Sequence, residues 1–325
     1  MKVFVSAQLE DEVIDYLKER AEVVFDGWGP TGKILTPEQL VERAKDCEMM
    51  VICYEPVTEY VFENLPSLRF ISCTRGGMEN FDKEVVRRYP RVTVCNAPGR
   101  NANAVADLTL GLMIDISRNI SLSSHYIRNQ DWNHVKWFKA GKLSKKMFMG
   151  YELEGKTLGL IGMGQVGYRV ARRALGFDMK VQAFDPYSRV EMDHVTYVDL
   201  DTLLRTSDFV SLHCKVTPET TGIINTETIG KMKQESFLIN TARGVLVNED
   251  DLIHALEEKR IAGAAMDTIA VEPIPENHPF IHMVNVVVTP HIGGASYDIQ
   301  AQQSKIVFED IKAYMEGRRA PHVWA

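Results

Sequence analysis

The chain has 325 residues, of which 45% are hydrophobic and 25% are charged, and its formal net charge is −7. This length exceeds one typical hydrophobic core and predicts two domains. A negative net charge without a basic run argues against a nucleic-acid partner, and no apolar run approaches the roughly 20 residues that span a bilayer. The first residues lead straight into a strand-like run, so we expect no signal peptide and a cytoplasmic location.

Cysteine usage gives the same indication. The five cysteines are odd in number and show no CxxC spacing, which argues against a disulfide framework and against a zinc site. Three of them end apolar runs at 49–53, 70–73 and 92–95, so we interpret them as small hydrophobic residues at strand ends rather than catalytic thiols. A reducing compartment is therefore expected. The five are Cys47, Cys53, Cys73, Cys95 and Cys214.

Short apolar runs alternate with helical patterns in the first hundred residues. Val13, Ile14 and Leu17 share one face of a helix predicted over 11–20, and a second helix is predicted over 37–45. This alternation indicates βαβ units, a parallel sheet and right-handed connections. The predicted strands are 3–6, 21–25, 49–53, 70–73 and 92–96.

A second alternating set begins near residue 156. Its six predicted strands are enough for a complete doubly wound nucleotide-binding sheet. A long apolar helix pattern at 103–120 suits a crossing between domains, and a final helix pattern at 297–316 is placed to return to the first domain. The sequence thus predicts an α/β protein with two doubly wound parallel-sheet domains. The predicted strands are 157–161, 180–184, 209–212, 237–240, 264–266 and 286–289.

Residues 162–167 form a GxGxxG motif that follows a predicted strand and opens a predicted helix ending at Leu175. The motif alone is weak, but this context is the one that a dinucleotide site needs. Gly162 permits a tight turn, Gly164 lets the backbone approach a pyrophosphate, and Gly167 lets the helix pack on the strand. The helix N-terminus then offers free N–H donors to the anion.

Asp185 ends the next strand, eighteen residues after Gly167 and near the usual offset of the ribose-binding acid. Its carboxylate can accept hydrogen bonds from ribose hydroxyls and would repel a 2′-phosphate, so we expect NAD rather than NADP. Arg189 lies four residues further on and would weaken that preference. The alternative is an ordinary glycine-rich turn with a solvated aspartate at a strand end.

Three polar residues, Arg243, Glu272 and His291, follow the ends of three predicted strands. Ligands bind at the carboxyl ends of parallel strands. Arginine suits the carboxylate and keto oxygen of a 2-keto acid, and histidine suits proton transfer near neutral pH. A carboxylate beside the histidine would favour its protonated form. Each residue alone also fits a salt bridge, a solvated side chain or a structural histidine.

With these motifs the sequence closely resembles the D-isomer-specific 2-hydroxyacid dehydrogenases over essentially its whole length. The resemblance implies a Rossmann cofactor domain inserted in a flavodoxin-like substrate domain, with Arg243, Glu272 and His291 as catalytic residues. It also implies that His213 and Pro218 border the cofactor and that Asp267 meets the nicotinamide amide. The complete predicted cofactor set is Gly162, Gly164, Gln165, Val166, Gly167, Asp185, His213, Pro218, Thr241, Asp267 and Gly294.

The same resemblance assigns the rest of the chain. It implies a substrate domain of residues 1–99 plus 297–325, a cofactor domain of 100–296, and a homodimer built on the cofactor domain through an arm at 121–150. Trp132, Trp137 and Phe138 would anchor this arm. The segment 121–150 shows little helical or strand periodicity. The predicted substrate-binding residues are Arg75, Gly76, Gly77, Asn101 and Arg243, and no metal is expected.

Two points stay open at this stage. The family also includes NAD-sensing corepressors with the same fold, which resemble the enzymes at these residues, so a binding protein is the alternative to an enzyme. The substrate also remains open, from glyoxylate and hydroxypyruvate to sugar acids and 3-phosphoglycerate. Residues 54–57 follow the predicted strand 49–53 and lack the basic side chains that would resemble the phosphate-binding residues of a phosphoglycerate dehydrogenase. Arg75 and Arg100 could bind a phosphate in their place.

Overall fold

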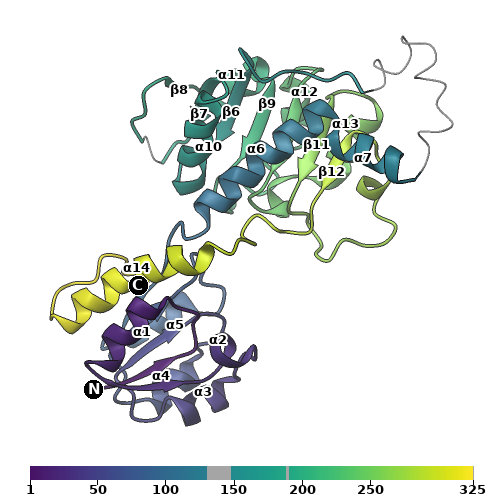
Figure 1. The fold of residues 1–325 in the computed structure, drawn as a ribbon. Helices are drawn as coiled ribbons and strands as arrows, with labels where there is room; N and C mark the ends of the chain where they lie inside the picture. Colours follow the sequence, from purple (N-terminus) through teal and green to yellow (C-terminus); the bar gives the residue numbers. More distant parts are fainter. Residues whose placement is uncertain (130–147, 188–189, 325) are drawn as a thin grey trace. The chain divides into compact units, whose positions relative to one another are not determined.

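The chain folds into two compact units in a computed structural model that describes residues 1–129, 148–187 and 190–324. The first unit comprises Met1–Asn101 and Ser296–Ala325, and the second comprises Ala102–Ala295 (Figure 1). The first unit is therefore built from both ends of the chain, and the second is inserted between them. Each unit is an α/β layer structure around one parallel sheet, as the alternating pattern predicted.

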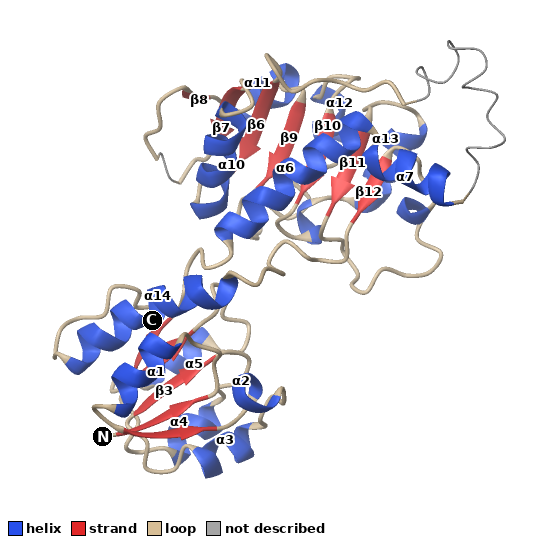
Figure 2. Cartoon of the chain, in the orientation of Figure 1, coloured by secondary structure: helices blue, strands red, loops and turns tan. Residues whose placement is uncertain are grey.

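The first unit contains five parallel strands in the order β2-β1-β3-β4-β5 (Figure 2). This is the order of flavodoxin-like sheets. The five strand predictions are confirmed to within one or two residues at each end. The strands are β1 (Lys2–Val5), β2 (Glu22–Phe25), β3 (Met49–Ile52), β4 (Phe70–Cys73) and β5 (Thr93–Cys95).

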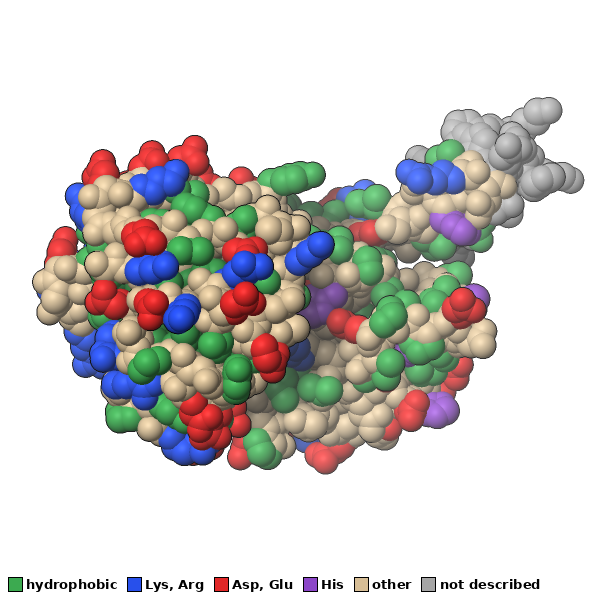
Figure 3. Space-filling view, turned by 90° about the horizontal axis from the view of Figure 1, so that it is seen from below, with side chains coloured by type: hydrophobic (Ala, Val, Ile, Leu, Met, Phe, Trp, Pro, Cys, Tyr) green, Lys and Arg blue, Asp and Glu red, His purple; other side chains and the backbone are tan. Residues whose placement is uncertain are grey.

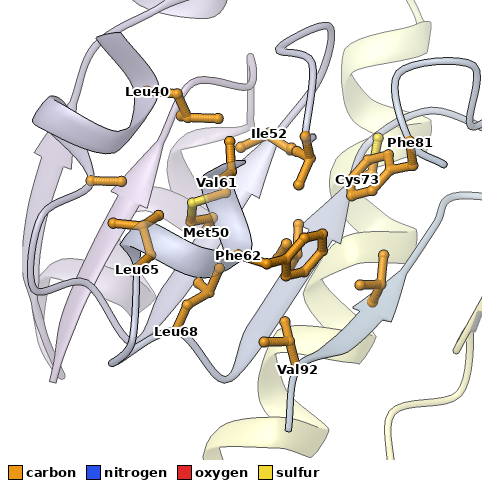
Figure 4. Close-up of a cluster of buried hydrophobic side chains, with 14 of the residues drawn as sticks. Leu40, Met50, Ile52, Val61, Phe62, Leu65, Leu68, Cys73, Phe81 and Val92 are labelled. Carbon is orange, nitrogen blue, oxygen red and sulfur yellow. The ribbon is translucent and has the colours of Figure 1, made fainter. Parts of the chain in front are cut away.

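Helices cover both faces of this sheet because its strands are apolar on both sides. Helices α3, α4 and α5 pack on one face around Phe62 and Met50 (Figure 4), whereas α1 and α14 pack on the other around Leu17 and Ile311. The final helix thus belongs to the first unit. The helices are α1 (Asp11–Lys18), α2 (Trp28–Thr31), α3 (Pro37–Arg43), α4 (Glu59–Asn64), α5 (Lys83–Arg88) and α14 (Ile299–Met315).

The second unit contains a parallel sheet in the order β12-β11-β10-β9-β6-β7-β8. The prediction of six strands was wrong by one, because β8 is a three-residue edge strand with only one aliphatic side chain and gives no apolar run. The chain order reverses between β6 and β9, which is where dinucleotides bind in such sheets. The strands are β6 (Thr157–Ile161), β7 (Lys180–Phe184), β8 (Val195–Tyr197), β9 (Phe209–Leu212), β10 (Phe237–Asn240), β11 (Gly263–Met266) and β12 (Val286–Val288).

Helices α6 and α10 cover one face of the second sheet, and α11, α12 and α13 cover the other. These two apolar layers hold the strand ends, and therefore the loops that follow them, in fixed register. The helices are α6 (Ala102–Arg118), α7 (Ile120–Arg128), α10 (Gln165–Leu175), α11 (Leu200–Thr206), α12 (Thr226–Lys231) and α13 (Glu249–Glu257), with 3₁₀ turns η2 (Gly244–Leu246) and η3 (Pro279–Ile281).

The region between α6 and β6 departs from prediction. The long helix ends at Arg118, and Asn119 turns the chain with φ of 55° into a second helix, α7. A segment without periodicity was expected there, and this was wrong for the residues of α7. None of the residues in α7 is buried. Its apolar side chains therefore do not form a core-facing side from which the helix could be predicted. Trp132, Trp137 and Phe138 lie outside the described residues.

Positively and negatively charged side chains lie near one another on the surface. Lysine and arginine side chains alternate with aspartate and glutamate side chains on the face drawn in Figure 3. No helix among the described residues is both long and apolar enough to cross a membrane.

Candidate active site

Six strands of the second sheet are each followed by a residue that the sequence predicted for the site. Because all seven strands run parallel, these residues share the carboxyl edge of one sheet. The structure therefore brings the predicted cofactor motif and the predicted catalytic set to the same edge. The pairs are β6 with Gly162, β7 with Asp185, β9 with His213, β10 with Arg243, β11 with Asp267 and β12 with His291.

Two positions of the glycine loop, Gly162 and Gly167, leave no room for a side chain. Gly162 has a φ of +99°, and a Cβ there would lie 2.6 Å from the backbone nitrogen of Cys214. A Cβ on Gly167 would lie 2.3 Å from the oxygen of Gly162, so only glycine lets α10 approach the strand end. At Gly164, by contrast, no described atom lies within 4 Å of the Cβ position.

The first turn of α10 fits a pyrophosphate. Gly164 is the N-cap, and no described side chain caps the helix. Its first N–H groups therefore have no side-chain acceptor at the N-cap among the described residues, and such groups can bind an anion. Gln165 and Val166 form this turn, and Val166 packs partly against the core.

Asp185 is tied directly to the glycine loop. Its Oδ2 accepts a hydrogen bond of 2.9 Å from the Met163 N–H, and its Oδ1 accepts one of 3.0 Å from the Tyr187 N–H. The side chain is partly exposed. The carboxylate is therefore held at the loop that the sequence assigned to the pyrophosphate, where an adjoining ribose would meet it. Arg189 lies outside the described residues.

His213 lies beside the glycine loop in a low-polarity setting. The backbone N–H of His213 donates to the backbone carbonyl oxygen of Ile161 at 2.8 Å, and the ring Nε2 lies 2.9 Å from the Ser211 hydroxyl. Burial lowers the pKa of His213 to about 3. The ring is thus neutral at physiological pH and suits packing against a ligand rather than carrying a proton.

Arg243 is placed by a turn that Asn240 organises. The fully buried Asn240 accepts a hydrogen bond from the Ala242 N–H at 3.1 Å and donates one to the Arg243 oxygen at 3.0 Å. The buried Thr241 hydroxyl lies 2.9 Å from that of Thr109 on α6. The backbone of the turn is therefore anchored to the core, while the Arg243 side chain is exposed.

Glu272 and His291 meet as the sequence predicted. Oε2 of Glu272 lies 2.7 Å from Nδ1 of His291, and the two side chains are 38% and 46% exposed. The contact engages Nδ1 of the ring. This pair has both the geometry and the accessibility that a proton-transferring site needs.

The backbone of His291 is held in an unusual conformation. Its φ is +53°, in the left-handed region that few residues other than glycine occupy. Its N–H donates to the oxygens of Asp267 and Thr289, each at 2.9 Å. Such a conformation persists only where its surroundings impose it, and it commonly marks functional sites.

The Asp267 side chain imposes that conformation. It is 2% exposed, and it accepts hydrogen bonds from the Thr289 hydroxyl at 2.6 Å, from the Ile292 N–H at 2.8 Å and from the Gly293 N–H at 2.8 Å. The observed partners of this carboxylate are therefore the two flanks of His291. Gly294 follows directly in the same loop and is half-buried. Pro218 is exposed in the turn after His213.

The predicted substrate residues Arg75, Gly76, Gly77 and Asn101 lie in the first unit, and so apart in the chain from the catalytic set. Arg75 pairs with Glu79 at 2.9 Å and lies 5.0 Å from the centre of the Tyr54 ring. The Gly76 oxygen accepts a hydrogen bond from Asn96 at 2.9 Å. Asn101 is the last residue before the second unit begins.

Sequence reasoning missed a buried carboxylate in the first unit. Glu55 is fully buried, and it accepts hydrogen bonds from the Ser6 hydroxyl at 2.6 Å, the Trp28 N–H at 2.9 Å and the Cys53 N–H at 3.3 Å. These donors come from the ends of three different strands. Nothing in the local pattern around Glu55 distinguishes it from a solvated strand-end glutamate.

Thiol or metal chemistry would require reactive cysteines or clustered acidic and histidine side chains among the described residues. Four of the five cysteines are buried, and burial raises the pKa of Cys47 to about 11 and of Cys73 to about 12, which disfavours thiolates. Within residues 1–129, 148–187 and 190–324, no cluster of three His, Cys, Asp or Glu side chains is arranged for a metal. A surface depression bordered by Tyr16, Arg20 and Tyr314 lies near Met1, at the amino end of β1, and so at the opposite edge of the first sheet from Glu55.

Known proteins resemble this chain in both sequence and fold. Residues 110–293 match the family model described as D-isomer specific 2-hydroxyacid dehydrogenase, NAD binding domain. A glyoxylate reductase of Korarchaeum cryptofilum is 35% identical over 329 residues, which cover 99% of this chain and 95% of that protein. The crystal structure of TT0316 protein from Thermus thermophilus is 32% identical with a TM-score of 0.82, and that of D-lactate dehydrogenase with NAD+ from Lactobacillus jensenii is 27% identical with a TM-score of 0.79. Both matches cover 100% of each chain.

Proposed function

The chain belongs to the D-isomer-specific 2-hydroxyacid dehydrogenase family and is an NAD-dependent oxidoreductase, and from this premise we propose that it interconverts a small 2-keto acid and the corresponding D-2-hydroxy acid. The observation that carries the proposal is the 2.7 Å contact between Glu272 and His291. It lies at the sheet edge that also bears the glycine loop. An exposed acid–base pair beside a dinucleotide motif is what reduction of a carbonyl at C2 requires.

We assign the roles as follows. His291 holds the proton that the C2 oxygen takes during reduction, and Glu272 orients the ring and favours its protonated form. The Arg243 guanidinium binds the substrate carboxylate and polarises the keto oxygen. From the family resemblance we also propose Arg75, Gly76, Gly77 and Asn101, all in the first unit, as substrate-binding residues.

NAD(H) supplies the hydride acceptor or donor when it is bound. The glycine loop and the uncapped first turn of α10 would hold its pyrophosphate, and Asp185 its adenosine ribose. The neutral His213 and Pro218 would border it, while Thr241, Asp267 and Gly294 would line the nicotinamide end. Since a carboxylate at Asp185 would repel the 2′-phosphate of NADP, we propose NAD as the preferred cofactor.

A panel of 2-keto acids with NADH absorbance as the readout tests this function. Glyoxylate, hydroxypyruvate, pyruvate and a phosphorylated keto acid would separate the substrate classes. We expect turnover with at least one small keto acid, and turnover lower by about 10²–10⁴-fold in the His291→Asn variant. A wild-type protein that binds NADH but reduces none of the panel would contradict the proposal and favour a binding role, which the names glyoxylate reductase and D-lactate dehydrogenase among its relatives do not support.

We further propose a cytoplasmic homodimer. The five cysteines are free, as thiols are in a reducing compartment. The dimer rests on the family resemblance, with the arm of residues 121–150 reaching the partner subunit and Trp132, Trp137 and Phe138 as anchors. Sedimentation at micromolar concentration should give a dimer that a Trp137→Ala/Phe138→Ala variant weakens. A wild-type monomer would contradict it.

A further inference from the structure

Glu272 lies in the loop between β11 and η3, and two consecutive backbone N–H groups of that loop donate to carboxylates. The Ile269 N–H donates to Oε1 of Glu272 itself at 3.3 Å. The Ala270 N–H donates to Oε1 of Glu249 at 2.7 Å. The acceptor of the shorter bond, Glu249, therefore lies outside the loop and precedes Ala270 by 21 residues in the chain.

Glu249 has the environment of a structural acceptor and not of a surface charge. It is the first residue of α13, but its side chain is only 14% exposed, and its Oε2 lies 3.4 Å from Nε2 of His278. Nδ1 of His278 accepts the Phe280 N–H at 3.3 Å, so Nε2 bears the ring proton and donates to Glu249. Both oxygens of the carboxylate thus have partners on the Glu272 side of the helix.

The same loop also lies against the turn that carries Arg243. A Cβ on Gly244 would lie 2.0 Å from the carbonyl carbon of Ile269 and 2.4 Å from the nitrogen of Ala270. The backbone of Ile269 and Ala270 therefore lies against Gly244 and is hydrogen-bonded to Glu249. Together these contacts leave the loop little freedom two residues before Glu272.

We propose that Glu249 is a positioning residue that acts through Ala270 to hold the Glu272 carboxylate against His291. This inference rests on the proposed function of that pair. Among the described contacts, the titratable group facing Glu249 is His278, the one facing His291 is Glu272, and Asp267 is bonded to both flanks of His291. Without Glu249 the Ala270 N–H loses its acceptor, and the loop that aims Glu272 loosens.

Three substitutions on one helical turn test the proposal. Glu249→Ala removes the acceptor, Glu249→Gln keeps one oxygen for Ala270, and Asp250→Ala is the matched control because Asp250 is an exposed neighbour. We expect Glu249→Ala to lower kcat about tenfold, less than the roughly 10²-fold that a 1 Å misplacement of a catalytic group can cost, because Glu249 acts through one backbone bond. Its reduction profile should also fall off at lower pH than that of the wild type. Glu249→Gln should restore most of kcat and the wild-type profile, and Asp250→Ala should change neither.

A double variant separates positioning from general damage. In the Glu272→Gln background, Glu249→Ala should produce no additional change in the pH profile, because its effect passes through Glu272. A full additional change, an unaltered Glu249→Ala enzyme, or a Glu249→Gln enzyme as impaired as Glu249→Ala would each overturn the inference.

Amide hydrogen exchange keeps this test distinct from that of the function. In Glu249→Ala the peptide containing Ile269 to Glu272 should exchange faster than in the wild type, whether or not the protein reduces a keto acid. Inactivity of the wild type with faster exchange in the variant would reject the proposed function alone. Unchanged exchange would reject the positioning role alone.

Discussion

The carboxyl edges of the two sheets both carry glutamates just beyond a strand, and the two glutamates have opposite surroundings. Glu55 in the first unit is fully buried, and both of its oxygens accept hydrogen bonds from protein donors. Glu272 in the second unit is 38% exposed and pairs with a histidine that is itself exposed. The first glutamate joins three strand ends, and the second meets solvent.

A position at the carboxyl end of a strand is thus required for a catalytic residue in such folds, but it does not by itself identify one. A fully buried carboxylate that accepts hydrogen bonds from backbone and hydroxyl donors stabilises the loops that carry those donors. A carboxylate that keeps solvent access and one titratable partner can take part in chemistry.

The largest effect is expected at His291. His291→Asn should reduce keto-acid turnover by about 10²–10⁴-fold, the usual contribution of a positioned acid–base group. Asparagine is chosen because it tolerates the left-handed backbone found at this residue, so the fold should be retained. Stopped-flow reduction and NADH fluorescence titration should show lost chemistry with nearly normal NADH affinity. Retention of more than about a tenth of the turnover would contradict the assignment.

The two glutamates should respond to the same substitution in opposite ways. Glu55→Gln should lower the free energy of unfolding by about 2 kcal/mol, because a buried charged acceptor of three hydrogen bonds is lost. Glu272→Gln should change it by less than about 0.5 kcal/mol, as surface substitutions do. Urea unfolding monitored by circular dichroism measures both. Equal effects on stability would break the contrast drawn here.

His213 should make stability depend on pH. Its folded-state pKa of about 3 lies below the unfolded value near 6.5, so the unfolded chain binds more protons between these values. Stability should therefore fall as pH drops below about 6.5, by about 2 kcal/mol between pH 7 and pH 5 from this group. His213→Gln should remove that component, whereas His254→Gln, at a side chain 76% exposed, should not. Unfolding of the cofactor-free protein at both pH values decides between them.

Asp185 is an intermediate case, since it is bonded to the glycine loop yet partly exposed. Asp185→Ser should narrow the preference in kcat/KM for NADH over NADPH by about tenfold, which corresponds to ~1.4 kcal/mol of charge repulsion near the surface. Steady-state kinetics with both cofactors measures the ratio. If the ratio stays constant, another residue, such as Arg189, governs the choice.

The smallest effect concerns the pH range of activity. Glu272→Gln keeps the shape of the side chain but removes the carboxylate beside His291, so reduction should fall off at lower pH than in the wild type. A series of kcat measurements across the alkaline limb measures the displacement. A profile that does not move, or that moves upward, argues against the pairing as a functional contact.

The sequence alone was sufficient for the fold class and for the placement of most strands. Thr157–Ile161, Lys180–Phe184, Phe209–Leu212 and Phe237–Asn240 match their predicted bounds, because buried parallel strands form apolar runs that stop abruptly at a turn. The same rule located Arg243, Asp185 and His291 directly after strands. It failed for β8 and α7, whose side chains form no buried face.

Contacts between residues distant in the sequence could not be predicted and are seen only in the tertiary structure. Glu55 and Glu272 both precede a proline after a predicted strand, and no local pattern tells that one is buried and the other exposed. Likewise, the bond from Ala270 to Glu249, the bonds from Asp267 to both flanks of His291 and the left-handed turn at His291 depend on which loops the sheet brings together. Periodicity reports which face of an element is apolar, whereas the partner of a polar side chain is set by the packing of elements distant in the chain.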